Sequence, residues 1–341
     1  MMKAVVFNGV GKDLVSVEKP IPVLNKGDVL VKVKLCGICT SDIMAQQGDA
    51  TDYTPPVVLG HEIAGVIVES RNANFKENQK VSVDPVMSCD VCYYCRNGME
   101  KFCPEISGIG HNIDGGYAEY VRIPQKLADS NGIAVVPDEV TMEELVFLEP
   151  LACCLGALSE MKLGENVVIL GAGPIGLLFL QLAKHEGAQV FISEPLKHRR
   201  NMAEMLGAEN VFDPNSEPIV QIIYDLTKGI GADSVISATN NPAVIPDMFK
   251  MLRRGGYANF FGLFPHNTKI ELDAEQLHFS GHKVLASWAM TRKDTIKAQE
   301  EISKRWMKLE PILTGKFSLD DPMEAFNYVV QRKGLKAAFV T

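Results

Sequence analysis

The stretch Val167-Val168-Ile169-Leu170-Gly171-Ala172-Gly173-Pro174-Ile175-Gly176 decides the fold of the part of the chain in which it lies. Four apolar residues lead into a G-x-G-x-x-G turn and then into an apolar helical pattern, which predicts a buried strand, a tight turn and a helix. The first glycine permits the turn, the second lets the backbone approach a pyrophosphate, and the third lets helix and strand pack closely. The N-terminus of the predicted helix offers free N–H groups to phosphates. We therefore expect a dinucleotide to bind at Gly171, Gly173, Pro174, Ile175 and Gly176.

An acidic residue closes the next apolar strand. Glu194 follows residues 190–193, at about the spacing expected for a carboxylate that accepts hydrogen bonds from the adenosine ribose. Because a carboxylate at this place repels a 2′-phosphate, NAD is expected in preference to NADP. Arg199 and Arg200 lie a few residues further on; either could contact the adenosine end of the cofactor, or both could lie on a solvated helix face.

Strands and helices alternate around this motif, a rhythm typical of a parallel sheet covered by helices on both faces. The expected strands are residues 167–170, 190–193, 233–237 and 257–261, and the expected helices are residues 175–185, 199–206, 219–226 and 242–251. After about residue 284 the pattern is mixed, with helices expected at 292–307 and 322–330.

The first third of the chain consists of short β segments broken by turn residues, which predicts a barrel-like β domain. These segments are residues 4–7, 28–35, 64–69, 79–84 and 116–123. A length of 341 residues suggests two domains. The predicted fold class is therefore α/β plus mainly β.

Composition narrows the function classes. With 46% hydrophobic residues, 22% charged residues and a net charge of -8, the chain has the composition of an ordinary soluble, acidic protein. It contains no basic run interleaved with aromatic residues, and its apolar stretches are too short to span a bilayer. Neither nucleic acid nor membrane is expected as a partner. The first residues enter a strand-like pattern at once, without the features of a signal peptide, so a cytoplasmic location is expected.

Four of the eight cysteines form the most specific feature of the chain. Cys89, Cys92, Cys95 and Cys103 have the close spacing that lets four thiolates surround one ion tetrahedrally. Such a closed site leaves no position for a substrate, so its role would be structural, with metal binding supplying folding energy. Zinc is the expected metal, and an iron-sulfur cluster is the alternative.

A second set of candidate metal ligands is spread along the chain. Cys39, the neighbours His61 and Glu62, and Glu149 are each weak signals, because an isolated histidine beside a turn is more often structural than a ligand. Together they offer one sulfur, one nitrogen and carboxylate oxygens. This set suits a catalytic zinc with a position left open for water or substrate.

Together these residues resemble the zinc-containing medium-chain dehydrogenase/reductase family, especially its polyol and L-threonine dehydrogenase branch. The resemblance covers the whole chain. It implies a GroES-like catalytic domain of residues 1–148 and 284–341, with an inserted Rossmann NAD-binding domain of residues 149–283 and an active site in the cleft between them. Its marks are residues 39–42 (Cys-Thr-Ser-Asp), 60–62 (Gly-His-Glu), the four cysteines, 115–120 (Gly-Gly-Tyr-Ala-Glu-Tyr), 149–150 (Glu-Pro) and 171–176.

The resemblance implies that Cys39, His61 and Glu149 hold the catalytic zinc, with Glu62 either a ligand or a neighbour through water. It further implies that Ser41 relays a proton and that Asp42 orients the zinc-binding histidine. The expected cofactors are therefore NAD and two zinc ions per chain, one catalytic and one structural. The implied reaction is oxidation of a secondary alcohol to a ketone, in which zinc stabilises the alkoxide and hydride passes to the nicotinamide.

The expected substrate is a polyol or sugar alcohol, with a sugar-alcohol phosphate or L-threonine as alternatives. Polyol dehydrogenases carry an Arg-Tyr pair where this chain has residues 285–288 (Leu-Ala-Ser-Trp), which weakens a sorbitol assignment, and Met44 replaces a histidine of many relatives. His111 lies in a loop that faces either the cleft or solvent. A zinc-free quinone or enoyl reductase and a non-enzymatic homologue share the fold, but the joint presence of the metal-binding residues argues against both. A homodimer or homotetramer is expected.

Overall fold

The computed structural model describes residues 1–50 and 52–341. The chain divides into two compact units, one formed by Met1–Cys153 with Ala289–Thr341 and the other by Cys154–Trp288. The second unit is inserted into the sequence of the first. Both boundaries lie five residues after the expected ones, at 154 instead of 149 and at 289 instead of 284.

The larger unit is built mainly from β-sheets. Its seven-stranded sheet has the order β10-β6-β5-β3-β18-β17, and β9 also pairs with β3. A three-stranded sheet has the order β2-β1-β4, and β7 pairs with β8. The strands are β1 (Met2–Phe7), β2 (Val15–Lys19), β3 (Val29–Gly37), β4 (Val57–Val58), β5 (Glu62–Ser70), β6 (Lys80–Val83), β7 (Val86–Met87), β8 (Ser107–Gly108), β9 (Tyr120–Ile123), β10 (Ile133–Val135), β17 (Leu313–Ser318) and β18 (Lys336–Val340).

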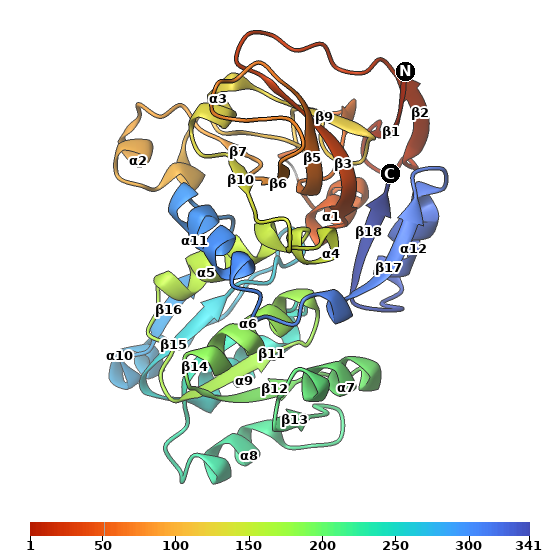
Figure 1. Cartoon of the computed structure of the whole chain (residues 1–341). Coiled ribbons are helices and arrows are strands. Elements are labelled where there is room, and N and C mark those ends of the chain that lie inside the picture. The colour runs from red at the N-terminus through yellow and green to blue at the C-terminus, as the bar shows by residue number, and fades with distance from the viewer. Residues whose placement is uncertain (51) are drawn as a thin grey trace. The chain divides into compact units, whose positions relative to one another are not determined.

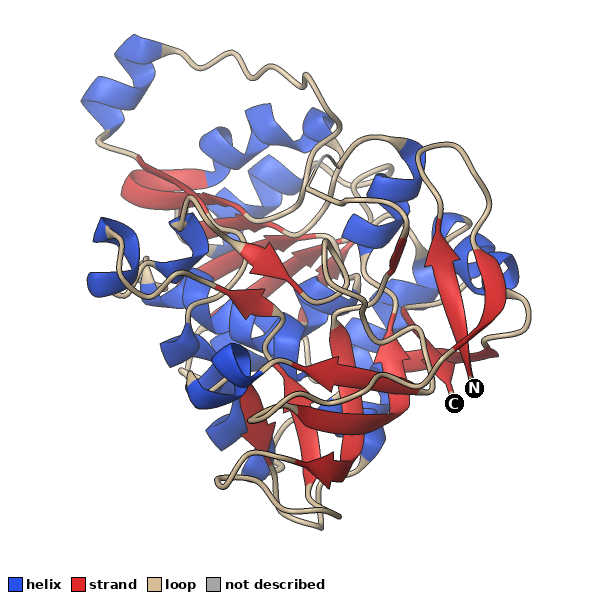
Figure 2. Ribbon diagram, turned by 90° about the horizontal axis from the view of Figure 1, so that it is seen from above, coloured by secondary structure: helices blue, strands red, loops and turns tan. Residues whose placement is uncertain are grey.

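Short helices connect these strands, and two longer ones follow the inserted unit. They are α1 (Thr40–Gln47), α2 (Tyr93–Arg96), η1 (Glu100–Phe102), α3 (Gln125–Asp129), α4 (Met142–Leu145), α11 (Arg292–Ser303), η3 (Glu310–Ile312) and α12 (Pro322–Val330). Helix α5 (Leu148–Ser159) contains the first boundary between the units. Figure 1 and Figure 2 both place the two chain termini on the same side of this unit.

The core of the larger unit contains side chains from both the N-terminal and the C-terminal segments of the chain. Strand β3 has seven buried residues, and its two half-buried ones, Lys32 and Lys34, alternate with buried Val31, Val33 and Leu35, as expected for a strand inside a sheet. Tyr117 is fully buried, and its ring contacts those of Phe326 and Phe339 at centroid distances of 6.3 and 4.8 Å. The C-terminal segment therefore completes a core that the first third of the chain begins.

The inserted unit is a six-stranded, all-parallel sheet with the order β13-β12-β11-β14-β15-β16. Counted from its first strand this order is 3-2-1-4-5-6, the arrangement of the Rossmann fold. Its elements are β11 (Asn166–Leu170), α6 (Pro174–His185), β12 (Gln189–Ser193), α7 (Lys197–Met205), β13 (Asn210–Phe212), α8 (Ile219–Leu226), β14 (Ala232–Ser237), η2 (Pro242–Val244), α9 (Ile245–Met251), β15 (Leu252–Phe260), α10 (Ala274–Ser280) and β16 (Lys283–Ala286). The prediction of a β domain with an inserted doubly wound sheet is confirmed.

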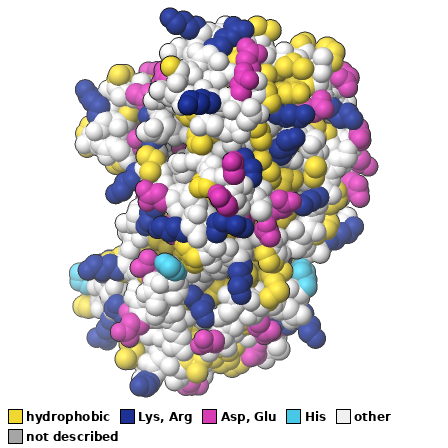
Figure 3. Space-filling model, viewed as in Figure 1, with side chains coloured by type: hydrophobic (Ala, Val, Ile, Leu, Met, Phe, Trp, Pro, Cys, Tyr) yellow, Lys and Arg dark blue, Asp and Glu magenta, His cyan; other side chains and the backbone are white. Residues whose placement is uncertain are grey.

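The surface has the mixed polarity expected from the composition. Basic and acidic side chains are interspersed over the face that Figure 3 displays. Among the described residues, no helix combines the length and the apolar character needed to cross a membrane.

Candidate active site and metal centres

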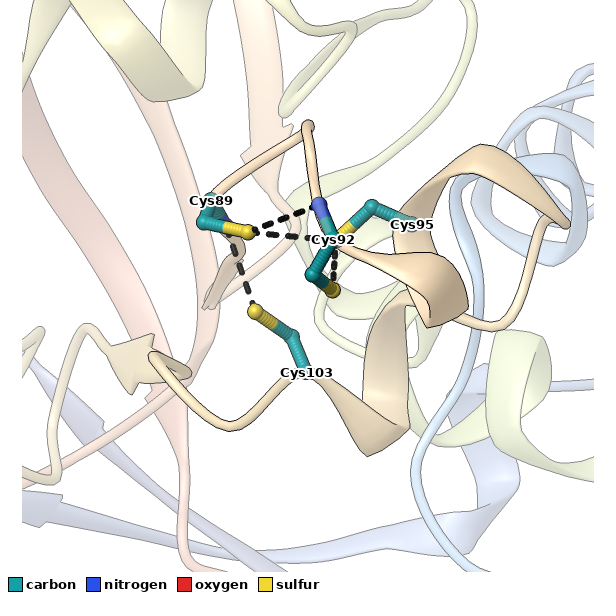
Figure 4. Close-up of side chains that lie close together, drawn as sticks. All are labelled: Cys89, Cys92, Cys95 and Cys103. Atoms are coloured by element: carbon teal, nitrogen blue, oxygen red, sulfur yellow. Dashed lines mark hydrogen bonds between the residues drawn. The ribbon is translucent and has the colours of Figure 1, made fainter.

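The four clustered cysteines converge on one point (Figure 4). Their sulfur atoms all lie within 4.8 Å of one another, with Cys95 Sγ 3.9 Å from Cys89 Sγ and 3.4 Å from Cys92 Sγ. Four thiolates around zinc at the usual bond length are separated by about 3.8 Å. The four sulfur atoms therefore fit a tetrahedral zinc ion, and all four cysteines are free of disulfides.

Local backbone groups favour the thiolate form that a metal requires. The N–H groups of Val91 and Cys92 lower the pKa of the Cys89 thiol to about 7, and the N–H of Cys89 donates to Cys103 Sγ over 3.3 Å. Backbone N–H groups that point at sulfur compensate the charge of thiolates. Burial, in contrast, raises the pKa of the Cys103 thiol to about 11, so the loop itself favours the thiolate form at Cys89 and not at Cys103.

Helix α11 holds the segment that leads into this loop. Arg292 donates to Ser88 Oγ over 3.1 Å and is ion-paired with Asp90 over 2.9 Å. One turn later, Thr295 Oγ1 donates to the buried Asp84 carboxylate over 2.7 Å. The C-terminal part of the chain therefore fixes the start of the cysteine loop.

The pairing of β3 with β5 brings together three of the expected ligands of the second site. The strands are antiparallel, and Gly37 at the end of β3 lies opposite Glu62 at the start of β5. Cys39 follows β3 by two residues, and His61 directly precedes β5. As a result, donor atoms of Cys39, His61 and Glu62 all lie within 4.8 Å of one another.

This cluster is electrostatically prepared for a cation. Burial lowers the pKa of His61, but the charges of Asp42 and Cys39 outweigh burial and hold that pKa well above its usual range. His61 Nδ1 is buried and lies 3.6 Å from Asp42 Oδ1. Among the described residues, this nitrogen has no hydrogen-bond partner. A site that favours a proton on histidine in this way also favours a metal ion in its place. The residues present therefore fit a metal.

Glu149 is not a member of the cluster of mutually close donors. It begins the first turn of α5 and is buried, and burial raises its pKa to about 7 although the nearby His61 lowers it. Cys153, one turn later, donates from Sγ to Glu149 Oε1 over 3.4 Å. Glu149 thus lies in the same buried neighbourhood as His61 but not within ligand distance of all three other donors.

Lys336 is a site residue that sequence reasoning missed. Its ammonium group is buried, is ion-paired with the Glu62 carboxylate and donates to the carbonyl oxygen of Ile38 over 3.1 Å. Strand β18 pairs with β3, with Ala338 opposite Gly37, which brings Lys336 to the metal-binding end of β3. No local motif marks this lysine, and its partner lies 274 residues away in sequence.

Ser41 and Asp42 lie in the first turn of α1, next to Cys39. The side chain of Ser41 lies close to the hydroxyl of Tyr53 and lowers its pKa, although burial raises that pKa well above its usual range. The buried Asp42 carboxylate accepts hydrogen bonds from the hydroxyl of Tyr117 over 2.5 Å and from the backbone N–H of Cys39 over 3.2 Å. Asp42 is therefore held beside His61 by two hydrogen bonds, while Ser41 lies next to the Tyr53 hydroxyl.

The glycine turn of the inserted unit has the geometry that its sequence predicts. Gly171 has a φ of +103°, which favours glycine, and a Cβ on Gly176 would lie 1.9 Å from the carbonyl oxygen of Gly171. Gly173 is the N-cap of α6, and Pro174 occupies its first turn. Arg199 lies beside this turn, since a Cβ on Gly173 would be 3.5 Å from its Nη1.

Glu194 lies against the same turn. It is buried, and its two carboxylate oxygens accept hydrogen bonds from the N–H groups of Ala172, over 2.8 Å, and Leu196, over 2.9 Å. Arg200 donates to the carbonyl oxygens of Glu194 and Pro195 and is ion-paired with Asp213. Arg200 is thus committed to holding this loop, whereas Glu194 places a negative charge at the glycine turn.

Ser287 and His111, two residues considered from the sequence in connection with the substrate, differ in their surroundings. Ser287 is buried in the inserted unit, where its hydroxyl accepts from Asn259 and donates to Glu160, each over 3.1 Å. His111 lies beside the candidate metal cluster, with its ring centroid 5.1 Å from that of His61. The Ser287 hydroxyl is therefore engaged within the inserted unit, whereas His111 adjoins the candidate metal cluster.

Comparison with known proteins agrees with this architecture. Residues 25–130 match the alcohol dehydrogenase GroES-like domain, and residues 174–304 match the zinc-binding dehydrogenase domain. The chain is 31% identical to a D-arabitol-phosphate dehydrogenase of Enterococcus avium, over 98% of this chain and 96% of that protein. It is 30% identical to an L-threonine 3-dehydrogenase of Pyrococcus furiosus, over 97% and 95% of the two chains.

Solved structures show the same similarity. A zinc-binding dehydrogenase of Sinorhizobium meliloti bound to NADP superimposes with a TM-score of 0.91 at 30% identity, over 100% of this chain and 99% of that one. A 2R,3R-butanediol dehydrogenase of Bacillus subtilis gives a TM-score of 0.89 at 25% identity, over 100% of both chains. The chain belongs to the zinc-binding alcohol dehydrogenase family, in its polyol and threonine dehydrogenase branch. It is an NAD(P)-dependent oxidoreductase that acts on an alcohol and uses zinc.

Proposed function

We propose that this enzyme oxidises a secondary alcohol group of a vicinal diol or polyol to a ketone and transfers the hydride to NAD. The observation that carries the proposal is the cluster of Cys39, His61 and Glu62, which combines three types of donor within 4.8 Å. A mixed set of this kind leaves a coordination position open for a substrate, unlike a closed set of four thiolates.

In this proposal Cys39, His61 and Glu149 hold the catalytic zinc, with Glu62 as a further ligand or a neighbour through water. Cys89, Cys92, Cys95 and Cys103 hold the structural zinc. When bound, the catalytic zinc supplies Lewis acidity and the nicotinamide supplies a hydride acceptor. Asp42 fixes the orientation of His61, and the Lys336 ammonium compensates the charge of Glu62.

Ser41 is proposed to move the hydroxyl proton of the substrate outward. Its side chain lies close to the hydroxyl of Tyr53, which is itself 3.5 Å from Asp42 Oδ1, so other hydroxyl and carboxylate groups lie near the serine oxygen. Such positioning is what a proton-transfer group needs, since general acid–base catalysis requires a donor and an acceptor within hydrogen-bond reach.

A vicinal diol or polyol is favoured because two neighbouring oxygens can be recognised together by the cluster and its carboxylates. Relatives named D-arabitol-phosphate dehydrogenase and scyllo-inosose 3-dehydrogenase act on compounds with several hydroxyl groups, and the butanediol dehydrogenase acts on a vicinal diol. A sugar-alcohol phosphate and L-threonine are the alternatives that the relatives' names support.

A substrate panel tests this proposal. Purified enzyme is supplied with NAD and with vicinal diols, polyols, polyol phosphates, L-threonine and simple primary alcohols, and formation of NADH is followed by its absorbance. The highest kcat/KM is expected with a diol or polyol. Turnover only with primary alcohols, or only reduction of carbon–carbon double bonds by NADPH, would contradict the proposed function.

We also propose NAD as the preferred cofactor, because the buried Glu194 places a carboxylate at the glycine turn and Arg200 is engaged elsewhere. Repulsion between this carboxylate and a 2′-phosphate amounts to at most about 4 kcal/mol at roughly 4 Å and an effective dielectric constant near 20. The ratio of kcat/KM for NAD and NADP measures this preference, and equal values would argue against the role of Glu194.

A homodimer or homotetramer and a cytoplasmic location complete the proposal. Strand β16 ends the parallel sheet, and Val284 on it and Phe279 just before it are 40% and 73% exposed. An exposed edge strand with apolar side chains is a common site of pairing between chains. None of the eight cysteines, all of which are among the described residues, forms a disulfide, which suits a reducing compartment.

A further inference from the structure

His111 is held in place by its own backbone. It lies in the turn after β8, where its N–H donates to the carbonyl oxygen of Gly108 over 3.2 Å. Its own carbonyl oxygen accepts from the N–H of Thr54 over 3.0 Å. The side chain of Asn112 closes the turn by accepting from the N–H of Gly108 over 2.8 Å. Two segments distant in sequence are thus joined at His111.

The imidazole ring of His111 is part of the candidate active site. It stacks on the ring of Tyr53 with a centroid distance of 4.4 Å and an interplanar angle of 23°. Its centroid is also 5.1 Å from that of His61. Tyr53 is almost fully buried, and its hydroxyl lies close to the side chain of Ser41. His111 therefore adjoins both a proposed metal ligand and the partner of the proposed proton-transfer group.

A carboxylate orients the two nitrogen atoms of this ring. Asp52 Oδ2 lies 3.1 Å from His111 Nδ1, and a carboxylate at neutral pH can only accept hydrogen bonds. Nδ1 must therefore carry the proton of this bond. In the neutral ring Nε2 is then left with a lone pair and is a hydrogen-bond acceptor. The His111 side chain remains 22% exposed.

We infer that His111 is a specificity-determining residue, whose Nε2 accepts a hydrogen bond from a substrate hydroxyl other than the one that is oxidised. The inference rests on the proposed function and deepens it, because it names a residue that distinguishes a diol from a simple alcohol. An acceptor at this place pairs with a hydroxyl donor, whereas a phosphate or carboxylate of a substrate has only acceptor oxygens to offer. The uncharged diol or polyol is thereby favoured over a substrate with an anionic group on this side.

Matched substrates and matched variants test the inference. Each diol or polyol of the panel is paired with the analogue that lacks the second hydroxyl, such as 2,3-butanediol with 2-butanol. His111→Phe keeps a ring on Tyr53 but removes the acceptor, and His111→Gln restores an acceptor oxygen. His266→Phe, at an exposed histidine of the inserted unit, is the control.

The ratio of kcat/KM for the diol to that for its analogue should fall by about threefold to tenfold in His111→Phe, the effect of one neutral hydrogen bond. It should recover at least in part in His111→Gln and stay unchanged in His266→Phe. The dissociation constant of the diol for the enzyme–NADH complex, in which no hydride can be transferred, should rise by the same factor in His111→Phe.

The two possible failures are distinct. A wild-type enzyme that prefers diols together with a His111→Phe variant that keeps this preference, or that loses activity equally on both substrates, overturns the role of His111 alone. A wild-type enzyme with no preference for diols over their analogues overturns the proposed substrate class, and the inference with it.

Discussion

Lys336 compensates the charge of a carboxylate that would otherwise be isolated from water. Glu62 and Lys336 are 1% and 5% exposed, and burying either charge alone costs several kcal/mol. The ammonium group of Lys336 therefore offsets the charge of the buried Glu62 carboxylate beside Cys39 and His61. Because the ammonium group is paired with the carboxylate, the availability of Glu62 as a ligand in the proposed site depends on Lys336.

Replacing Lys336 with Met should destabilise the protein by about 3–5 kcal/mol, because it leaves a buried carboxylate without a partner. Urea unfolding followed by circular dichroism measures the loss. Glu62→Gln in the same background should recover part of it, since the unpaired charge is then removed. Losses that simply add in the double variant would show that the two groups do not interact.

Replacing Ser41 with Ala should cost rate far more than binding, because its hydroxyl is proposed to move the substrate proton. A decrease in kcat of about a hundredfold to ten-thousandfold is expected, the usual contribution of general acid–base catalysis. The dissociation constant of NADH, measured by fluorescence titration, should change little. A variant with nearly full kcat would remove Ser41 from the mechanism.

At the scale of secondary-structure elements, helix α11 links the C-terminal part of the chain to the cysteine loop through Arg292 and Thr295. Periodicity predicted the helices of residues 219–226 and 322–330 with the observed ends, since both have clear apolar faces. It did not predict β16, whose side chains are mostly exposed, or the start of β15, where Arg253-Arg254-Gly255-Gly256 breaks the apolar pattern.

Asp84, which lies before the cysteine loop and is bound by Thr295 of α11, should make the free energy of unfolding depend on pH. Burial raises the pKa of this carboxyl to about 6 although Thr295 donates to it. The folded state then holds the proton more tightly than the unfolded state, so this contribution to stability is full at low pH. It declines as pH rises from about 4 to about 6 and is constant above.

The difference in unfolding free energy between wild type and Asp84→Asn should therefore fall over this range by at most about 3 kcal/mol. Urea denaturation at several pH values between 4.5 and 8 measures it. A difference that is constant with pH would mean that Asp84 titrates alike in both states.

The two metal centres should respond differently to the loss of one ligand. Cys92→Ser should lower thermal stability and solubility, because the structural ion supplies folding energy to its loop. His61→Ala should abolish turnover and leave the fold nearly unchanged. Elemental analysis of protein purified without chelator should give two zinc ions per wild-type chain and one in each variant; one or none in the wild type would contradict the assignment.

At the scale of the whole molecule, what the sequence could predict depended on how far apart the interacting residues lie. The glycine turn and the four cysteines are short motifs whose parts meet locally, and both were found. The contacts of Lys336 with Glu62 and of His111 with Asp52 join distant segments. These contacts form only through strand pairing and loop packing, so no local sequence pattern predicts them.

The exposed edge strand β16 of the inserted sheet is expected to take part in the association of chains. A charge introduced at Val284, which is 40% exposed on β16, should weaken association, because lysine on an edge strand opposes strand pairing. Val284→Lys should shift the protein towards smaller species in sedimentation velocity, while Val23→Lys, at a loop residue that is 81% exposed, should not. A monomeric wild type would contradict the proposal of an oligomer.

The position of β18 inside the seven-stranded sheet, between β3 and β17, sets the order in which a new chain can mature on the ribosome. Residues 154–288 form a unit of their own, and they leave the exit tunnel before the last strand of the unit that precedes them. The domain begun first is consequently the one completed last. Until residue 336 emerges, Glu62 lacks its counter-ion, so the proposed metal site of the nascent chain is complete only after the whole inserted unit has been synthesised.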